Sequence, residues 1–97
     1  MSKLGQIRKY NKVSLVKFES PDCKSCKQMT DALEEAKLGV KIFTVNVMES
    51  PNAANYYGIT SLPTVLVLSP DGKEIDRAVG FSGGSIPRLK RVLYESK

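Results

Sequence analysis

The sequence predicts an α/β fold in which helices cover both faces of a mixed four-stranded sheet. Segments with the composition of strands alternate along the chain with segments that carry a helical apolar stripe. A helix separates the first two strands, so these strands are expected to run parallel, whereas a tight turn joins the last two, which are expected to run antiparallel. The length of 97 residues predicts a single domain spanning residues 1–97.

Two elements are expected before the cysteines. Residues 2–10 predict a short helix, because Leu4 and Ile7 fall on one of its faces. Residues 13–18, VSLVKF, are rich in Val, Leu and Phe and predict a buried strand. Pro21 then interrupts the extended segment, so the strand is expected to end before it.

A longer helix is expected over residues 23–37. Asp22 is a suitable N-cap for its start, and Gly39 is a suitable residue just beyond its end. Both cysteines and the apolar side chains recur every three or four positions, which places them on one helical face. The members of this face are Cys23, Cys26, Met29, Leu33 and Ala36.

Turn residues and periodicity define the rest of the chain. Pro70-Asp71-Gly72 predicts a turn, because Pro fixes φ and Gly accepts a positive φ, and the flanking strands then form a hairpin. Ser85 is a suitable cap for a last helix with Pro87 in its first turn. The expected elements are a strand over 40–47, a short helix over 51–57, strands over 63–69 and 74–79, and a helix over 86–95 with Ile86, Leu89, Val92 and Leu93 facing inward.

The composition excludes several kinds of site. The chain contains two cysteines and no histidine, so it has no histidine-dependent catalytic arrangement and cannot close a structural zinc site alone. Two cysteines allow one internal disulfide, which is too few for a disulfide-stapled secreted scaffold. We therefore expect no metal site within this chain.

Charge and hydropathy restrict the partners. The net charge is +5, but the basic residues are spread along the chain without interleaved aromatic side chains. This pattern predicts a solvated basic surface and no nucleic-acid partner. No stretch approaches the length of a bilayer-spanning segment, and the N-terminus lacks the apolar core of a signal peptide. We expect a cytoplasmic protein with no membrane partner.

The motif that carries chemistry is Cys23-Lys24-Ser25-Cys26, at the junction between a strand and a helix. Two cysteines in one helical turn are close enough to form a disulfide. The unpaired N–H groups and the positive end of the helix dipole stabilise a thiolate at Cys23 and lower the pKa of a thiol there. Lys24 acts in the same direction and Asp22 in the opposite one, so the net shift stays open. Cys26 lies one turn deeper and is expected to be less exposed.

This arrangement predicts different chemical roles for the two thiols. Cys23 attacks a substrate disulfide, and Cys26 then attacks the mixed disulfide, which releases the reduced substrate and leaves a Cys23–Cys26 bridge. Half of a zinc or iron–sulfur site has the same spacing, although a second chain would have to supply the other ligands. A structural pair of buried cysteines is another alternative, but the position at a helix start favours redox chemistry.

Two segments together resemble the thioredoxin family. Cys23 to Cys26, followed by Lys27, resembles the active-site segment, and residues 58–64, GITSLPT, resemble the loop that carries a cis-proline. The Pro-Asp-Gly hairpin and the Val-Gly pair before the last helix also match. The resemblance, which runs from about residue 13 to the C-terminus, implies a thioredoxin-like fold.

The resemblance also implies a substrate site. It places a cis-Pro63 beside the two sulfurs and pairs the backbone of Leu62 with a substrate peptide as a short added strand. Lys24 and Ser25, which lie between the cysteines, are expected to contact the substrate as well.

The sequence departs from the family's pattern at several positions. Asp22 stands where thioredoxins carry Trp, Lys24-Ser25 replaces Gly-Pro, and the usual first strand is absent. Lys17 stands where the family has a buried Asp that accepts the proton of the second thiol. A buried Lys is costly unless it is paired or neutral, so we expect Lys17 either to reach solvent or to pair with an acid such as Glu19 or Asp22.

The expected protein is therefore a small, monomeric, thioredoxin-like protein-disulfide reductase that needs no bound cofactor. The resemblance implies disulfide-containing client proteins and an electron donor resembling a thioredoxin reductase. One alternative is a non-catalytic binding module with the same fold. Another is a glutaredoxin-like protein that uses glutathione or a metal held between two chains. Glutaredoxins share the four-stranded core, but residues 62–64, Leu-Pro-Thr, look more like thioredoxin.

Overall fold

A computed structural model describes residues 3–96, and each helix and strand expected from the sequence is present in it. The first residue of the first expected helix, Ser2, lies outside the described residues. No helix within residues 3–96 combines the length and apolar character needed to cross a bilayer. The elements in chain order are α1 (Lys3–Lys9), β1 (Ser14–Glu19), α2 (Lys24–Ala36), β2 (Lys41–Asn46), α3 (Pro51–Tyr56), β3 (Thr64–Leu68), β4 (Glu74–Val79) and α4 (Ser85–Glu95).

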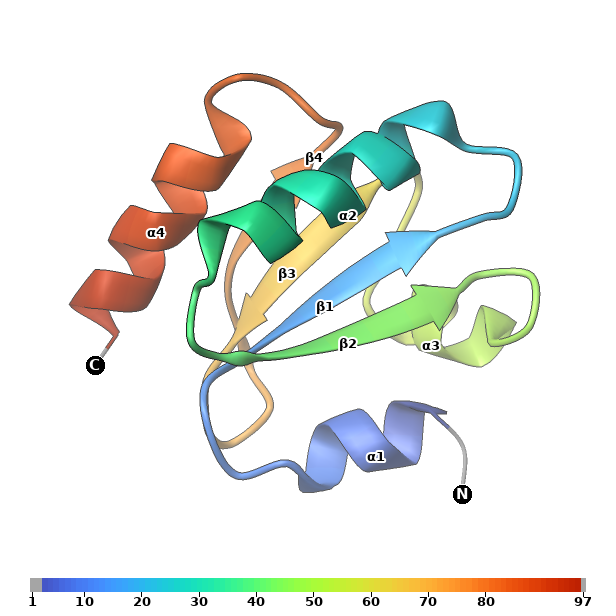
Figure 1. Ribbon diagram of the computed structural model, residues 1–97. Coiled ribbons are helices and arrows are strands. Elements are labelled where there is room, and N and C mark those ends of the chain that lie inside the picture. Colours follow the sequence, from blue (N-terminus) through green and yellow to red (C-terminus); the bar gives the residue numbers. More distant parts are fainter. Residues whose placement is uncertain (1–2, 97) are drawn as a thin grey trace.

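The four strands form one mixed sheet in the order β2-β1-β3-β4 (Figure 1). β1 runs parallel to β2 and antiparallel to β3, and β3 pairs with β4 as an antiparallel hairpin. The predicted parallel pair and the predicted hairpin are therefore confirmed. The turn of the hairpin is closed by a hydrogen bond of 2.9 Å from Gly72 N to Ser69 O, and Gly72 has a φ of 83°.

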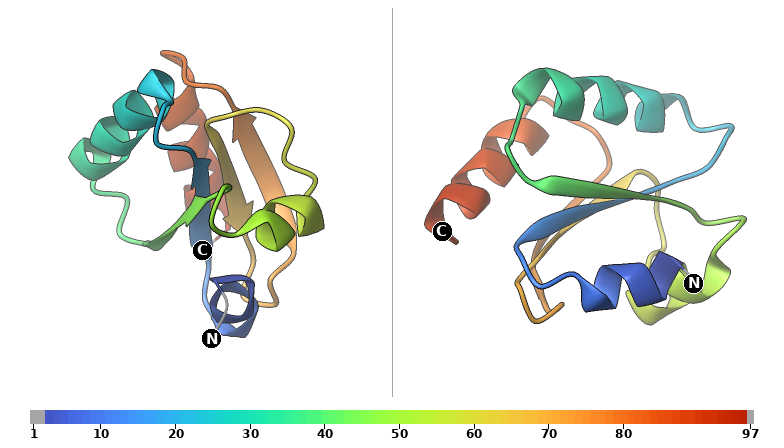
Figure 2. Two further views of the ribbon diagram at one scale, coloured as in Figure 1. Left: turned by 90° about the vertical axis from the view of Figure 1, so that its right-hand side faces the viewer. Right: turned by 60° about the horizontal axis from the view of Figure 1, so that its bottom comes forward.

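Helices cover both faces of this sheet, as predicted, with α1 and α3 on one side and α2 and α4 on the other (Figure 2). Side chains alternate between the two faces along each strand, so the sheet divides the interior into two clusters. The cluster under α1 and α3 contains Ile7, Val16, Phe18, Phe43, Val45, Ala53, Ala54, Tyr57, Leu66 and Leu68. The cluster under α2 and α4 contains Leu15, Met29, Leu33, Val65, Val67, Ala78, Leu89 and Leu93.

The start of α2 corrects one prediction. Asp22 was expected to cap this helix, but the N-cap is Cys23, whose sulfur accepts a hydrogen bond of 3.1 Å from the backbone N–H of Cys26. Asp22 instead belongs to a tight turn, in which Cys23 N donates to Ser20 O at 3.3 Å. Because Pro21 and Asp22 form this turn, Asp22 lies one residue before the N-cap position.

Two other helix ends also differ from expectation. α2 ends at Ala36, and its C-cap Lys37 takes the left-handed conformation with a φ of 46°, two residues before Gly39. Ser85 is the first residue of α4 rather than its cap, and Gly84 holds the N-cap position. The Ser85 hydroxyl oxygen accepts a hydrogen bond of 3.1 Å from the backbone N–H of Ser82. It therefore stabilises the preceding loop and does not cap its own helix.

An ion pair fastens α4 to the edge strand β4. Arg88 Nη2 lies 2.7 Å from Asp76 Oδ1, and Arg88 Nε donates to Asp76 Oδ2 at 2.9 Å. These hydrogen bonds hold the pKa of the Asp76 carboxyl below its ordinary value, against the opposing effect of burial. Because the native pKa is lowered, the pair stabilises the fold above the ordinary pKa of an aspartate. That contribution is lost as the pH falls through the lowered value.

Asp76→Asn is therefore expected to lower the urea midpoint of unfolding slightly at neutral pH and not at all below the lowered pKa of Asp76. The effect is small because Arg88 is more than half exposed, and exposed ion pairs are weak and screened by salt. Glu49→Gln, which removes an exposed carboxylate, serves as the control. A difference between wild type and Asp76→Asn that persists at acid pH would contradict this assignment.

Candidate active site

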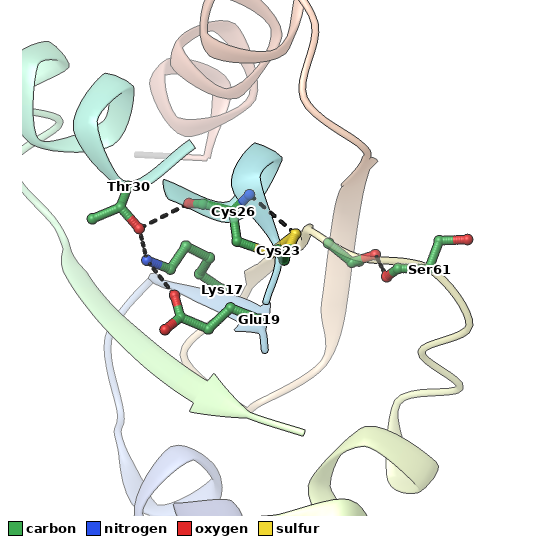
Figure 3. The surroundings of a disulfide bond; sticks show 7 residues. Lys17, Glu19, Cys23, Cys26, Thr30 and Ser61 are labelled. Carbon is green, nitrogen blue, oxygen red and sulfur yellow. Dashed lines mark hydrogen bonds and ion pairs between the residues drawn. A yellow bond between two sulfur atoms is a disulfide. The ribbon is translucent and has the colours of Figure 1, made fainter. Parts of the chain in front are cut away.

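Cys23 and Cys26 form a disulfide at the N-terminus of α2, just beyond the end of β1 (Figure 3). Their Cα atoms are 5.2 Å apart, as the spacing within one helical turn predicts. Cys26 is 2% exposed, whereas Cys23 is only partly buried. The expected difference in exposure is confirmed, so Cys23 carries the more accessible of the two sulfurs.

The start of α2 gives the Cys23 sulfur a hydrogen-bond donor. The bond of 3.1 Å from Cys26 N is the N-cap interaction of the helix, with sulfur in place of the usual oxygen. In the reduced protein the same N–H group and the positive end of the helix dipole favour a negative charge on this sulfur. Lys24 and Ser25 lie between the cysteines in the first turn, where Lys24 is exposed and Ser25 is partly exposed.

The loop before β3 contains the cis peptide bond between Leu62 and Pro63. Pro63 is buried and Leu62 is partly exposed. Pro63 O accepts a hydrogen bond of 2.8 Å from Gly80 N, which connects the loop to the end of β4. The Thr64 hydroxyl donates to Ser61 O at 2.7 Å. In the view of Figure 3, Ser61 lies on the opposite side of the disulfide from Lys17.

Lys17 occupies a buried position on β1, on the face that α2 covers. The residue is 3% exposed, and its Nζ lies 2.8 Å from Glu19 Oε1. Nζ also donates a hydrogen bond to the Thr30 hydroxyl, which in turn donates to Cys26 O at 3.0 Å. Of the expected alternatives, pairing with Glu19 is confirmed, whereas the expectation that Lys17 reaches solvent is wrong.

Thr30 is the member of this site that sequence reasoning missed. It follows Cys26 by four positions, and a Thr in a helix commonly donates to the carbonyl four residues earlier. That spacing was the available signal, but only the folded chain brings the Lys17 ammonium to the same hydroxyl. A cavity of about 260 Å³ beside the disulfide is lined by Thr30, Glu19 and both cysteines, among others.

The site thus holds one dithiol–disulfide pair as its reactive group. Within residues 3–96, no group of three or more His, Cys, Asp or Glu side chains is placed to hold a metal ion. A pair of cysteines in one helical turn interconverts between a disulfide and two thiols, and so exchanges two electrons with another disulfide.

Comparisons with known proteins agree with this chemistry. The sequence model of the Thioredoxin family matches residues 4–89. The chain is 33% identical over 79 residues to the SPbeta prophage-derived thioredoxin-like protein YosR of Bacillus subtilis, a match that covers 81% of this chain and 96% of that protein. It is 45% identical over 70 residues to the thioredoxin of Chlamydia caviae, covering 69% and 68% of the two chains. The solved structure of Trichomonas vaginalis thioredoxin superposes with a TM-score of 0.75 at 26% identity, covering 100% of this chain and 93% of that one.

Proposed function

The chain belongs to the thioredoxin family and is a protein-disulfide oxidoreductase, and from this premise we propose that Cys23 and Cys26 are its catalytic pair. The observation that carries the proposal is the Cys23–Cys26 disulfide at the start of α2, with one sulfur accessible and the other buried. We assign Cys23 as the attacking thiol and Cys26 as the resolving thiol.

The proposed cycle has two exchanges. The Cys23 thiolate attacks one sulfur of a client disulfide, so that a new S–S bond forms and the other client sulfur leaves as a thiolate. Cys26 then loses its proton and attacks Cys23 Sγ, which releases the remaining client sulfur. The client gains two electrons, and the protein is left with the disulfide described above. The electron donor must then return two electrons to restore the dithiol.

The client is proposed to bind across the first turn of α2 and the loop before β3. Leu62 is partly exposed beside the cis peptide bond, and its backbone groups suit pairing with an extended client segment. Pro63 would pack against that segment. Lys24 and Ser25 are exposed enough to contact a chain whose disulfide is under attack by Cys23.

Thioredoxins act on disulfide-containing clients and are reduced by a thioredoxin reductase. For this chain we propose a donor of that kind and a cytoplasmic location, because regeneration of the dithiol requires a reducing compartment. We also propose a monomer, since the exposed large apolar side chains within residues 3–96 are distributed over several elements. These side chains are Met48, Tyr56, Ile75, Val79 and Tyr94.

The reduction potential of the Cys23–Cys26 pair tests the direction of electron flow. Titration of the full chain against glutathione mixtures is expected to place it near the thioredoxin value of about −270 mV. A value close to that of a strong oxidant, about −120 mV, would contradict a reductase and indicate disulfide formation in clients instead.

A further inference from the structure

We propose that the Lys17–Glu19 ion pair sets the proton affinity of the Cys26 thiol, with its two charges acting in opposite directions. The inference deepens the proposed function and rests on it, because it concerns the thiol assigned to the resolving step. Neither residue touches the reacting atoms in this proposal, so both are positioning residues that act through the electrostatic field at Cys26.

A continuous set of hydrogen bonds joins the ion pair to the backbone of Cys26. Lys17 and Glu19 are two positions apart on β1, so their side chains emerge from the same face of the sheet, toward α2. Lys17 Nζ contacts both Glu19 Oε1, at 2.8 Å, and the Thr30 hydroxyl. Thr30 then donates to Cys26 O at 3.0 Å. The ammonium is therefore held against the turn of α2 that carries Cys26 (Figure 3).

Burial shields the Lys17 ammonium from water, and the Glu19 carboxylate is partly shielded. The Lys17 side chain is 4% exposed and that of Glu19 is 30% exposed, while Cys26 is 2% exposed. Glu19 and Cys26 line the same cavity of about 260 Å³. Charges act over longer distances and more strongly where protein replaces water. Each member of the pair is thus placed to change the energy of a negative charge on the Cys26 sulfur.

The resolving step requires that negative charge. Cys26 must lose its proton before it attacks Cys23, and the chain contains no histidine to receive it. A nearby ammonium favours the thiolate, and a nearby carboxylate disfavours it. In the intact pair the two influences oppose each other. Loss of either partner leaves the other charge uncompensated, and the two losses should move the ionisation of Cys26 in opposite directions.

Other charged groups near Cys26 are more exposed to solvent. Those on the preceding turn and on α2 are screened by water and salt to a greater degree than Lys17. The loop over residues 58–64, on the other side of the disulfide, carries no charged side chain. The groups in question are Asp22, Lys24, Lys27, Asp31 and Glu34, together with the Cys23 thiol itself.

The test follows the ionisation of Cys26 as the only thiol of the chain. In a Cys23→Ser background, the ultraviolet absorbance of the thiolate is recorded against pH. Lys17→Met is expected to raise the midpoint of ionisation, and Glu19→Gln to lower it, each by about one pH unit. The double variant Lys17→Met/Glu19→Gln is expected to return close to the parent. A purely structural role for the pair would move both single variants in the same direction.

Lys27→Met supplies the matched control, because Lys27 is an exposed cation directly after Cys26. Its shift is expected to be smaller than that of Lys17→Met and to disappear in high salt, whereas the shift from the buried pair persists. A Lys27→Met shift as large and as salt-resistant as that of Lys17→Met would overturn the assignment to the buried pair.

Glu19→Gln keeps the proposal open to refutation even if Lys17→Met does not fold, because the Glu19 side chain is partly exposed and the Gln amide oxygen still offers an acceptor to the Lys17 ammonium. An unchanged or raised midpoint in Glu19→Gln overturns the inference. If that happens while the wild-type chain reduces protein disulfides, the inference fails and the proposed function stands. If the wild-type chain is inactive toward protein disulfides, the proposed function fails whatever Cys26 does.

Discussion

Cys23→Ser is expected to reduce the dithiothreitol-driven reduction of insulin to the rate of dithiothreitol alone. The hydroxyl of Ser is not ionised near neutral pH and does not form a stable bond with a client sulfur, so the first exchange cannot begin. Serine is itself a favourable N-cap, so the start of α2 is retained in this variant. The loss of activity therefore reports chemistry and not unfolding.

Cys26→Ser is expected to give a different failure from Cys23→Ser. The accessible thiol of Cys23 still attacks, but without the buried thiol the mixed disulfide is not resolved and accumulates as a covalent protein–client species. Mass spectrometry of the products, before and after added reductant, detects that species. Gln28→Ser, at an exposed position of the same helix, is the control and is expected to keep full activity. Wild-type rates in Cys23→Ser would contradict the assigned roles.

Phe18→Ala is expected to destabilise the fold by about 3–5 kcal/mol, the usual cost of truncating a fully buried aromatic side chain. Phe18 is 0% exposed, and its ring centroid lies 6.1 Å from that of Tyr57 in an edge-to-face arrangement. Domains of this size are commonly stable by only about 5–15 kcal/mol, so the variant should unfold at a much lower urea concentration. Chemical denaturation followed by circular dichroism gives the free energy of unfolding.

Tyr94→Ala is the matched control for Phe18→Ala. Tyr94 is 78% exposed on α4, so the loss of its ring should change the free energy of unfolding by no more than about 0.5 kcal/mol. A loss in Phe18→Ala as small as the one expected for Tyr94→Ala would show that the cluster under α1 and α3 does not depend on Phe18. Because Phe18 lies between Lys17 and Glu19 on β1, its removal should also disturb the site above the opposite face of the sheet.

The elements of the fold were predictable because local patterns and global packing agree. The strand over VSLVKF is buried on both faces and has no charged residue before Lys17. The Pro-Asp-Gly segment suits few backbone conformations other than a turn. The helix ends were less predictable, since several neighbouring residues are chemically able to occupy a cap. Whether Asp22 or Cys23 caps α2 depends on how the chain turns after Pro21, and that turn is decided by the packing of α2 on the sheet.

The site was predictable to a similar extent. The spacing of Cys23 and Cys26 on a helix start is a local signal, and it identifies the reactive pair without tertiary information. Lys17 could be recognised as a residue that needs a partner, but two acids were available. The alternation of side chains along β1 places Glu19 on the same face as Lys17, and the packing of α2 on that face then brings Thr30 to the same ammonium. A hydroxyl one helical turn beyond Cys26 carries no sequence signal strong enough to predict that contact.

The sulfur of Cys23 has two structural duties, since it forms the disulfide and also caps α2 through the amide of Cys26. We expect the electron density on that sulfur to change when the bond opens, and the hydrogen bond to the Cys26 amide to change with it. A single backbone resonance in a nuclear magnetic resonance spectrum should therefore report the oxidation state of the protein directly. With such a reporter, the redox cycle can be followed in the absence of any client.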